Sequence, residues 1–305
     1  MIDPYGRPLN SIRISVTKKC NLNCFYCHRE GIKGEEDEIL PSDFENLFKV
    51  ASSLGIRKVK FTGGEPLERR DLEEIISIAR NYFSDISITT NGTMLAGRVR
   101  DLYEAGLNRI NISLHTLRRE TYKRITGVDA LNSVLEGIEE TLKTPLNPVK
   151  INMVLMKGLN DDEIKDMMGF VKNTKMVLQI IELEVPREGL EEPFYKKYHT
   201  SLDFVEDELK KMPHILKRNP LHNRERYVIN NGNRYEVELV KPMHNTEFCM
   251  NCTRIRLTYD GKLKPCIFRN DNLVPIIDEM KAGDMEGMRK KFYIAVERRE
   301  PYWKP

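Results

Sequence analysis

Hydrophobic and polar residues alternate along the first two thirds of the chain in a repeating order of short strand and helix. Strands are expected where apolar and β-branched residues form short runs that end at turn residues. Six such runs are "SIRISVT" (11–17), "KVKFTGG" (58–64), "DISITTNG" (85–92), "RINISLH" (109–115), "VKINMVLMKG" (149–158) and "VLQIIELEV" (177–185). Because helical segments separate them, the pattern predicts a parallel sheet covered by helices.

The segments between these runs show apolar residues three and four positions apart, as on one face of a helix. The first begins at "SDFENLF", where we expect Ser42 as the N-cap, Glu45 as its capping-box partner and Gly55 as the stop. Further helices are expected at 71–82, up to 106, and near 131–143, 160–173 and 201–212. An open doubly wound sheet and an incomplete barrel both fit this order. In either fold, the loops that follow the strands form the active face.

The alternation of strand and helix stops near residue 213. "RYVINNGNRYEVELV" predicts a hairpin that turns at Asn231-Gly232, and "TRIRLTYDGKLKPCIF" predicts another that turns at Asp260-Gly261. A helix is expected over roughly 276–297. We therefore divide the chain into residues 1–212, the strand–helix domain, and 213–305, a C-terminal region that completes it.

Composition narrows the class of protein. The 305 residues are 40% hydrophobic, which supports a packed core, and the net charge of +3 argues against nucleic acid as the main partner. The sequence lacks the run of about 18 apolar residues that a membrane span needs, and it begins without an apolar leader. We expect a cytoplasmic protein with no membrane partner. Its oligomeric state stays open between a monomer and a homodimer.

Six cysteines in a cytoplasmic protein indicate metal or redox chemistry, because disulfides are rare in that compartment. They form two triplets with the spacings C-x3-C-x2-C and C-x2-C-x13-C: Cys20, Cys24 and Cys27, and then Cys249, Cys252 and Cys266. Thiolates at such spacings suit iron–sulfur clusters. A [4Fe–4S] cluster has four irons, so three thiolates leave one iron free to bind a ligand.

Structural zinc is the alternative reading of the cysteines. One zinc could join the C-x2-C pairs of the two triplets, but Cys20 and Cys266 would then have no role. Two zinc sites of three cysteines and one histidine would each need a histidine nearby, and His28 and His244 are available.

The loop "KKCNLNCFYC" and the later motif "GGEP" resemble the signature of the radical S-adenosylmethionine enzymes. An aromatic residue, Tyr26, precedes the third cysteine, and "GGEP" ends the second expected strand. The resemblance implies a partial (β/α)6 TIM-like barrel with a [4Fe–4S] cluster on the first triplet. That cluster cleaves S-adenosylmethionine to a 5′-deoxyadenosyl radical, which abstracts hydrogen from the substrate. The implied contacts to S-adenosylmethionine come from Tyr26, Gly64 and Ser113, and more weakly from Gly63 and Glu65.

Within these enzymes, the chain resembles the molybdenum cofactor biosynthesis protein A family, the GTP 3′,8-cyclases. The resemblance rests on "SIRISVTKKCNLNCFYC", "KVKFTGGEPLERRD", "TTNG", "NISL", "VKINMVL" and "CTRIRLT" followed by "GKLKPC". It implies a second [4Fe–4S] cluster on the second triplet, whose open iron meets the guanine of GTP. The implied GTP contacts are Arg13, Lys60, Thr89, Lys150, Arg254, Ile255 and Arg256.

The same resemblance places the reaction in the first step of molybdopterin synthesis. GTP becomes a cyclic nucleotide through a bond between C3′ and C8, and a cyclic pyranopterin monophosphate synthase takes the product onward. An electron donor that the sequence does not identify must reduce the cluster.

Three features depart from the family pattern. Many relatives end in Gly-Gly, whereas this chain ends in "PYWKP". Gln179 stands where the family commonly has arginine, and Glu184 where it has methionine. One phosphate or cofactor contact is therefore unassigned by the resemblance.

Two other functions compete with this one. A radical enzyme that modifies a peptide or protein, with a truncated auxiliary-cluster domain, would usually need more than six cysteines and has no use for Arg254 and Arg256. An iron–sulfur electron carrier or oxygen sensor would need no "GGEP" motif, and three-cysteine sites make poor carriers.

Overall fold

A computed structural model describes residues 1–31 and 39–304 of the chain. In this part of the chain, one sheet has the strand order β12-β11-β10-β1-β2-β3-β4-β5-β6-β9-β8-β7. The strands are β1 (Ser11–Ser15), β2 (Lys58–Thr62), β3 (Asp85–Thr90), β4 (Arg109–Ser113), β5 (Val149–Leu155), β6 (Met176–Glu182), β7 (His214–Asn219), β8 (Arg224–Asn230), β9 (Arg234–Val240), β10 (Arg254–Leu257), β11 (Lys262–Lys264) and β12 (Val274–Pro275).

The parallel sheet contains eight strands, from β10 through β1–β6 to β9, although the strand–helix repeat supplies only the central six. Each expected hairpin provides one further strand. The second strand of the β8–β9 hairpin pairs with β6, and the first strand of the β10–β11 hairpin pairs with β1. The C-terminal third thereby extends the barrel at both edges, and its remaining strands form antiparallel borders.

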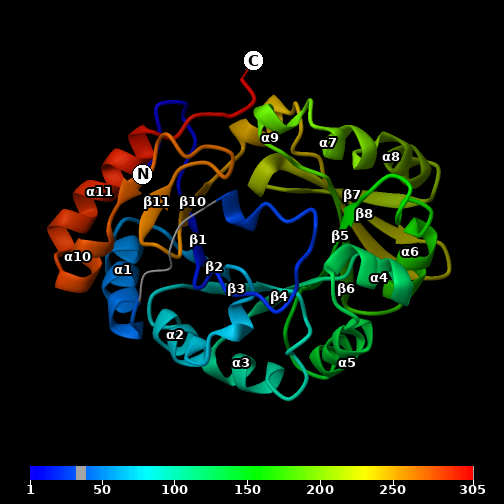
Figure 1. Cartoon of the computed structure of the whole chain (residues 1–305), viewed down its shortest axis with the longest axis horizontal. Helices are drawn as coiled ribbons and strands as arrows, with labels where there is room; N and C mark the ends of the chain where they lie inside the picture. Colours follow the sequence, from blue (N-terminus) through cyan, green and yellow to red (C-terminus); the bar gives the residue numbers. More distant parts are fainter. Residues whose placement is uncertain (32–38, 305) are drawn as a thin grey trace.

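Helices lie outside the curved sheet, and α1, α2, α3 and α5 follow its convex side in Figure 1. The described helices are α1 (Pro41–Ser53), α2 (Leu72–Ala79), α3 (Val99–Ala105), α4 (Arg119–Thr126), α5 (Leu131–Leu142), α6 (Ile164–Val171), α7 (Pro193–Tyr198), α8 (Asp203–Lys210), α9 (Thr246–Met250), α10 (Ile277–Ala282) and α11 (Met285–Glu297). Their apolar faces and the outward residues of the strands, such as Ile12, Phe61 and Ile151, form one continuous core. The expected partial barrel is confirmed.

Two expected helix boundaries were wrong. Helix α1 begins at Pro41 rather than after Ser42, and the carboxylate of Asp43, not that of Glu45, accepts from the Leu40 backbone N–H at 2.8 Å. The expected helix over 276–297 is two helices, because Gly283 adopts a left-handed conformation (φ 66°) and Asp284 caps the second helix. No helix among the described residues is long and apolar enough to cross a membrane.

The inward face of the barrel is polar because alternate residues of each strand point to opposite faces. Register then places these residues side by side. Arg256, Arg13 and Lys60 are neighbours on β10, β1 and β2. On the opposite wall, Gln179 of β6 lies beside Asn152 of β5 and Glu238 of β9 in the same way.

Candidate active site

A cavity of about 320 Å³ lies inside the partial barrel, and all eight parallel strands contribute side chains to its lining. Many of the predicted site residues line it: Arg13, Tyr26, Lys60, Thr89, Ser113, Lys150, Arg254, Arg256, Cys249, Cys252 and Cys266. The structure therefore brings the second cysteine triplet and most of the predicted nucleotide contacts to one place. Ile255 differs, because its side chain is fully buried in the core between sheet and helices, and only its backbone could reach a ligand.

The first triplet lies on the loop that follows the carboxyl end of β1. Cys20 and Cys27 are exposed and Cys24 is half-buried. The second triplet attaches to the other end of the neighbouring strand, since Cys252 precedes the amino end of β10, which pairs in parallel with β1. The two triplets thus lie at opposite ends of the β1–β10 pair.

The "GGEP" motif holds the first cysteine loop through close backbone approach. Gly64 N–H donates to the carbonyl of Thr17 at 2.8 Å, and Glu65 N–H donates to that of Lys19 at 2.7 Å. A Cβ atom at Gly64 would lie 2.1 Å from the Lys19 carbonyl oxygen, and one at Gly63 would lie 2.4 Å from that of Thr17. Both positions therefore require glycine.

Glu65 is fully buried and joins the loops that follow β2 and β3. Its carboxylate accepts from Thr90 Oγ1 at 2.7 Å and from the backbone N–H groups of Asn91 at 2.6 Å and Leu67 at 3.0 Å. Burial raises the pKa of Glu65 to about 7, although these three hydrogen bonds oppose the shift. With its acceptor positions used in this way, Glu65 acts as a positioning residue for the loops around the cysteines.

Tyr26, the aromatic residue of the cysteine loop, is fixed by a second contact. Its hydroxyl lies 2.5 Å from Nε2 of His115, whose Nδ1 accepts from the Val154 backbone N–H at 3.1 Å. Burial lowers the pKa of His115 to about 4, so the ring is neutral at pH 7. Because Nδ1 accepts from Val154, Nε2 carries the proton and donates to the Tyr26 hydroxyl oxygen. Tyr26 is thereby linked to His115, which follows β4, and through it to Val154 of β5.

Both triplets fit iron–sulfur clusters better than single metal ions. Burial raises the pKa of Cys24 to about 12 and that of Cys266 to about 11, and the other two thiols of each triplet add to the shift. The thiols of a triplet are therefore close enough to repel one another when ionised. Yet no three histidine, cysteine or acidic side chains in residues 1–31 and 39–304 are placed to hold one ion. Three thiolates in each triplet match a cluster in which separate irons each take one thiolate.

Contacts from distant parts of the chain support the second triplet. Arg7 donates to the Cys249 carbonyl at 2.9 Å, and Arg299 donates to the Cys252 carbonyl at 2.6 Å. The Trp303 backbone N–H points to Cys249 Sγ at 3.4 Å. The N-terminal segment and the C-terminal tail therefore both help to shape this end of the cavity.

A buried carboxylate organises the cations nearest to the first triplet. Glu30 pairs with Arg13 at 2.7 Å and with Arg256 at 3.2 Å. Burial alone would raise the pKa of Glu30, but these two guanidinium groups lower it to about 2. Glu184, which stands where the family commonly has methionine, also belongs to this region. Its carboxylate lines the cavity and lies 3.4 Å from His28 Nε2.

Other cations of the cavity have little counter-charge. Lys60 donates to the neutral Asn111 at 2.6 Å, and burial together with the nearby cations holds its pKa well below the usual value. Burial lowers the pKa of Lys150 to about 7, although its contact with Glu238 at 2.8 Å opposes this. No carboxylate among the described residues pairs with Arg254, which is repelled by Arg256 and Arg13. A bound polyanion would neutralise this excess of positive charge.

Sequence reasoning missed several lining residues: Arg7, Arg109, Asn111, His222, Arg224 and Tyr302. Arg109 and Asn111 alternate on β4 and could have been found from strand periodicity. His222 and Arg224 come from the β7–β8 connection, and no local pattern shows that it folds over the barrel. Tyr302 belongs to the C-terminal segment "PYWKP", which differs from the Gly-Gly ending of many relatives. Its hydroxyl accepts from the Arg187 backbone N–H at 2.7 Å.

Comparison with known proteins agrees with this geometry. Residues 14–171 match the Radical SAM superfamily, and residues 176–305 match the family described as Molybdenum Cofactor Synthesis C. A protein of Thermococcus kodakarensis named "Probable GTP 3',8-cyclase" is 50% identical over 307 residues, covering 100% of both chains. One of the same name from Methanothermobacter marburgensis is 48% identical, covering 99% of this chain and 98% of the relative.

Solved structures share the fold at much lower sequence identity. Streptococcus suis SuiB bound to S-adenosylmethionine superposes with a TM-score of 0.67 at 16% identity, covering 89% of this chain and 64% of SuiB. Native anSMEcpe with bound AdoMet gives 0.61 at 20% identity, covering 94% of this chain and 82% of that one. The aligned region spans 64% of SuiB, and the two chains share this architecture. From the two family matches and the full-length relatives, the chain belongs to the radical SAM superfamily and, within it, to the family of the GTP 3′,8-cyclases.

Proposed function

We propose that this chain is a lyase, a GTP 3′,8-cyclase that converts GTP to (8S)-3′,8-cyclo-7,8-dihydroguanosine 5′-triphosphate in the first step of molybdopterin cofactor biosynthesis. The observation that carries the proposal is one cavity that holds the second cysteine triplet and an excess of buried cations. A nucleoside triphosphate is the kind of ligand that such a cavity would neutralise. The full-length relatives named for this activity support the same substrate.

The residues present fit the cofactors that the family requires. Cys20, Cys24 and Cys27 would hold one [4Fe–4S] cluster, and Cys249, Cys252 and Cys266 would hold the other. When bound, the first cluster and S-adenosylmethionine supply reductive cleavage and hydrogen abstraction. Tyr26, Gly64 and Ser113 contact S-adenosylmethionine in this proposal, with Gly63 and Glu65 shaping the loop beside it.

The cavity residues bind and orient GTP. Arg13, Lys60, Lys150, Arg254 and Arg256 surround the phosphates and ribose, while Thr89 and the backbone of Ile255 make the remaining contacts. Glu30 already sets the positions of Arg13 and Arg256, and Glu238 that of Lys150, so these cations can hold the nucleotide without rearrangement. The walls of the barrel keep water from the reacting ribose.

The wider setting is also part of the proposal. The chain acts in the cytoplasm as two units, residues 1–212 and 213–305, and receives its electron from a separate donor. A cyclic pyranopterin monophosphate synthase consumes the product. We infer no nucleic-acid or membrane partner, and a homodimer is compatible with the fold.

The test is an anaerobic incubation of the reduced chain, loaded with iron and sulfide, with S-adenosylmethionine and GTP. We expect 5′-deoxyadenosine and a cyclised guanine nucleotide in equal amounts, and only slow uncoupled cleavage when ATP replaces GTP. Equal turnover with ATP would refute the substrate assignment. Absence of any cyclised nucleotide would favour the rival peptide-modifying enzyme. The likeness to SuiB does not by itself support that rival, because at 16% identity it shows a shared fold alone.

A further inference from the structure

We propose that Arg224, the first residue of β8, is a further residue that binds the phosphates of the nucleotide. The inference rests on the proposed function and adds to it a residue outside the strand–helix repeat. Arg224 lines the cavity, and its side chain is 11% exposed. A guanidinium so placed has a fork of N–H donors that matches phosphate oxygens.

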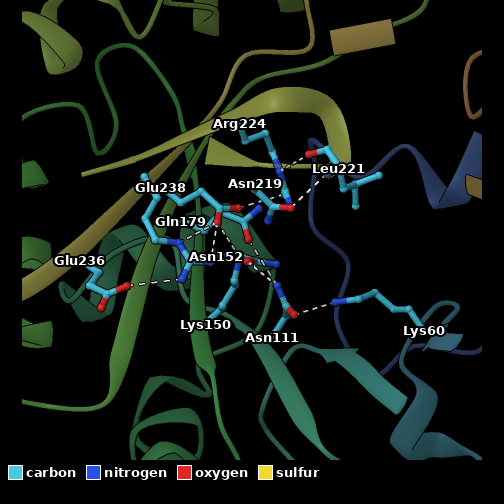
Figure 2. A network of polar contacts seen from close by, with 11 residues as sticks. Lys60, Asn111, Lys150, Asn152, Gln179, Asn219, Leu221, Arg224, Glu236 and Glu238 are labelled. Carbon is cyan, nitrogen blue, oxygen red and sulfur yellow. Dashed lines mark hydrogen bonds and ion pairs between the residues drawn. The ribbon is translucent and has the colours of Figure 1, made fainter. Parts of the chain in front are cut away.

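Two contacts fix the Arg224 side chain in this position. Its Nη1 lies 3.1 Å from Glu238 Oε1, and its Nε donates to the Leu221 carbonyl at 3.2 Å. These contacts use Nη1 and Nε, and Nη2 makes no hydrogen bond within residues 1–31 and 39–304, so it can donate to a ligand. Figure 2 shows Arg224 and Lys150 in the network around Glu238.

Glu238 holds the cations from behind the cavity. It is fully buried and does not line the cavity, whereas Lys150 and Arg224 do. Lys150 Nζ and Arg226 Nη2 each lie 2.8 Å from its Oε2, so one carboxylate serves three cations. Arg226 has a second carboxylate partner in Glu236 at 3.4 Å, whereas Lys150 and Arg224 pair with no carboxylate but Glu238 among the described residues. One carboxylate cannot neutralise three cations, so Lys150 and Arg224 present a net positive charge to the cavity.

The segment that carries Arg224 is docked on the second cysteine triplet. His222 N–H donates to the Asn251 carbonyl at 2.9 Å, and its ring stacks on Phe248 with centroids 3.8 Å apart. Asn223 donates to Glu247 at 2.5 Å. Phe248 and Asn251 lie on either side of Cys249. Arg224 is thus positioned by the same segment that holds the second triplet, which suits a residue that must bind a nucleotide reaching that triplet.

The neighbouring β6 strand offers no cation at this wall of the cavity. Gln179 is the register partner of Glu238 and lines the cavity, and its amide accepts from Asn111 at 3.4 Å. Arg224 therefore supplies, from the hairpin, the charge that Gln179 does not. An arginine at position 179 would lie beside the same carboxylate, which gives a way to restore the charge.

The test measures nucleotide binding by anaerobic equilibrium dialysis of the cluster-loaded full chain. We expect R224A to weaken GTP binding by about ten- to a hundredfold, since one charged hydrogen-bonding group is lost. Guanosine, which lacks phosphates, should bind R224A within about threefold of the unmodified chain. The double variant R224A/Q179R should recover most of the loss for GTP.

The matched control is R218A, because Arg218 is a half-exposed arginine on the preceding strand, paired with Glu225 at 3.0 Å. It should bind both ligands as the unmodified chain does. Equal loss of GTP and guanosine in R224A would show a general structural role and overturn the inference, as would unchanged GTP binding. If the unmodified chain itself fails to bind GTP, the proposed function fails instead, so the two failures are distinguishable.

Discussion

The two cysteine triplets are held by different kinds of contact. The loop with Cys20 and Cys27 is exposed, and backbone hydrogen bonds from Gly64 and Glu65 hold it. The close approach of the two backbones requires glycine at position 64. The second triplet is half-buried and depends on long side chains, including Arg7 and Arg299, that come from the two ends of the chain. The first arrangement is local and can be read from a motif, whereas the second exists only in the folded chain.

This difference suits the proposed division of labour. An exposed loop on a close-fitting backbone leaves room for S-adenosylmethionine and an electron donor to approach. A triplet enclosed by arginines from the chain ends instead forms the inner end of a substrate cavity. Substitutions that affect one type of support and not the other should therefore separate cofactor cleavage from GTP turnover.

The largest effect is expected from G64A. The added Cβ would lie 2.1 Å from the Lys19 carbonyl oxygen, so the cysteine loop must shift. Because a displacement of about 1 Å at a reacting centre costs roughly a hundredfold in rate, both 5′-deoxyadenosine formation and GTP cyclisation should fall at least that far. The matched control is G169A, since nothing lies within 4 Å of a Cβ at this helical glycine. Retention of cofactor cleavage by G64A would contradict the role given to close backbone approach.

C266S separates the two triplets most sharply. In the proposed function it would remove one ligand of the second cluster and leave the first loop intact, so slow cleavage of S-adenosylmethionine without GTP should persist while cyclisation is lost. C27S should abolish both. The measurement is quantitation of 5′-deoxyadenosine and cyclised nucleotide by chromatography. Equal loss of both activities in C266S would show that the triplets do not divide the work in this way.

E65Q tests the carboxylate that ties the first loop to β3. The folded pKa of Glu65, about 7, is above the ordinary carboxyl value of 4.5, so the folded state binds more protons than the unfolded state between these values. The free energy of unfolding should therefore fall as pH rises from 4.5 to 7, by up to about 3 kcal/mol. Glutamine does not titrate, so E65Q should lose this dependence. Denaturant unfolding at a fixed cluster content measures it, and parallel pH curves for both chains would count against the shift.

The same contrast explains how far the sequence could predict the molecule. Strand periodicity identified the six central strands, and the two triplets and "GGEP" identified the chemistry, because each is a local pattern. The pairing of β9 with β6 and β10 with β1, and the approach of Arg7, Arg224 and Tyr302 to the cavity, depend on contacts between segments far apart in sequence. Ile255 shows the converse limit, since a matching motif does not say which way a side chain points.

R299K should have the smallest effect and bears on the second triplet alone. Arg299 is 1% exposed; it donates to the Cys252 carbonyl at 2.6 Å and pairs with Asp3 at 3.3 Å. Lysine keeps the charge but cannot make both contacts from one planar group, so we expect a loss of about 1–3 kcal/mol in the free energy of unfolding.

Iron content should fall at the second site, GTP turnover should fall with it, and uncoupled cleavage of S-adenosylmethionine should stay unchanged. R298K is the control, because Arg298 is exposed and its side chain donates to the Leu273 carbonyl at 3.0 Å, away from the second triplet. If R299K instead lowered cofactor cleavage as much as GTP turnover, support of the two triplets would not be separate. The fold would then couple them through β1 and β10, the strands that join one triplet to the other.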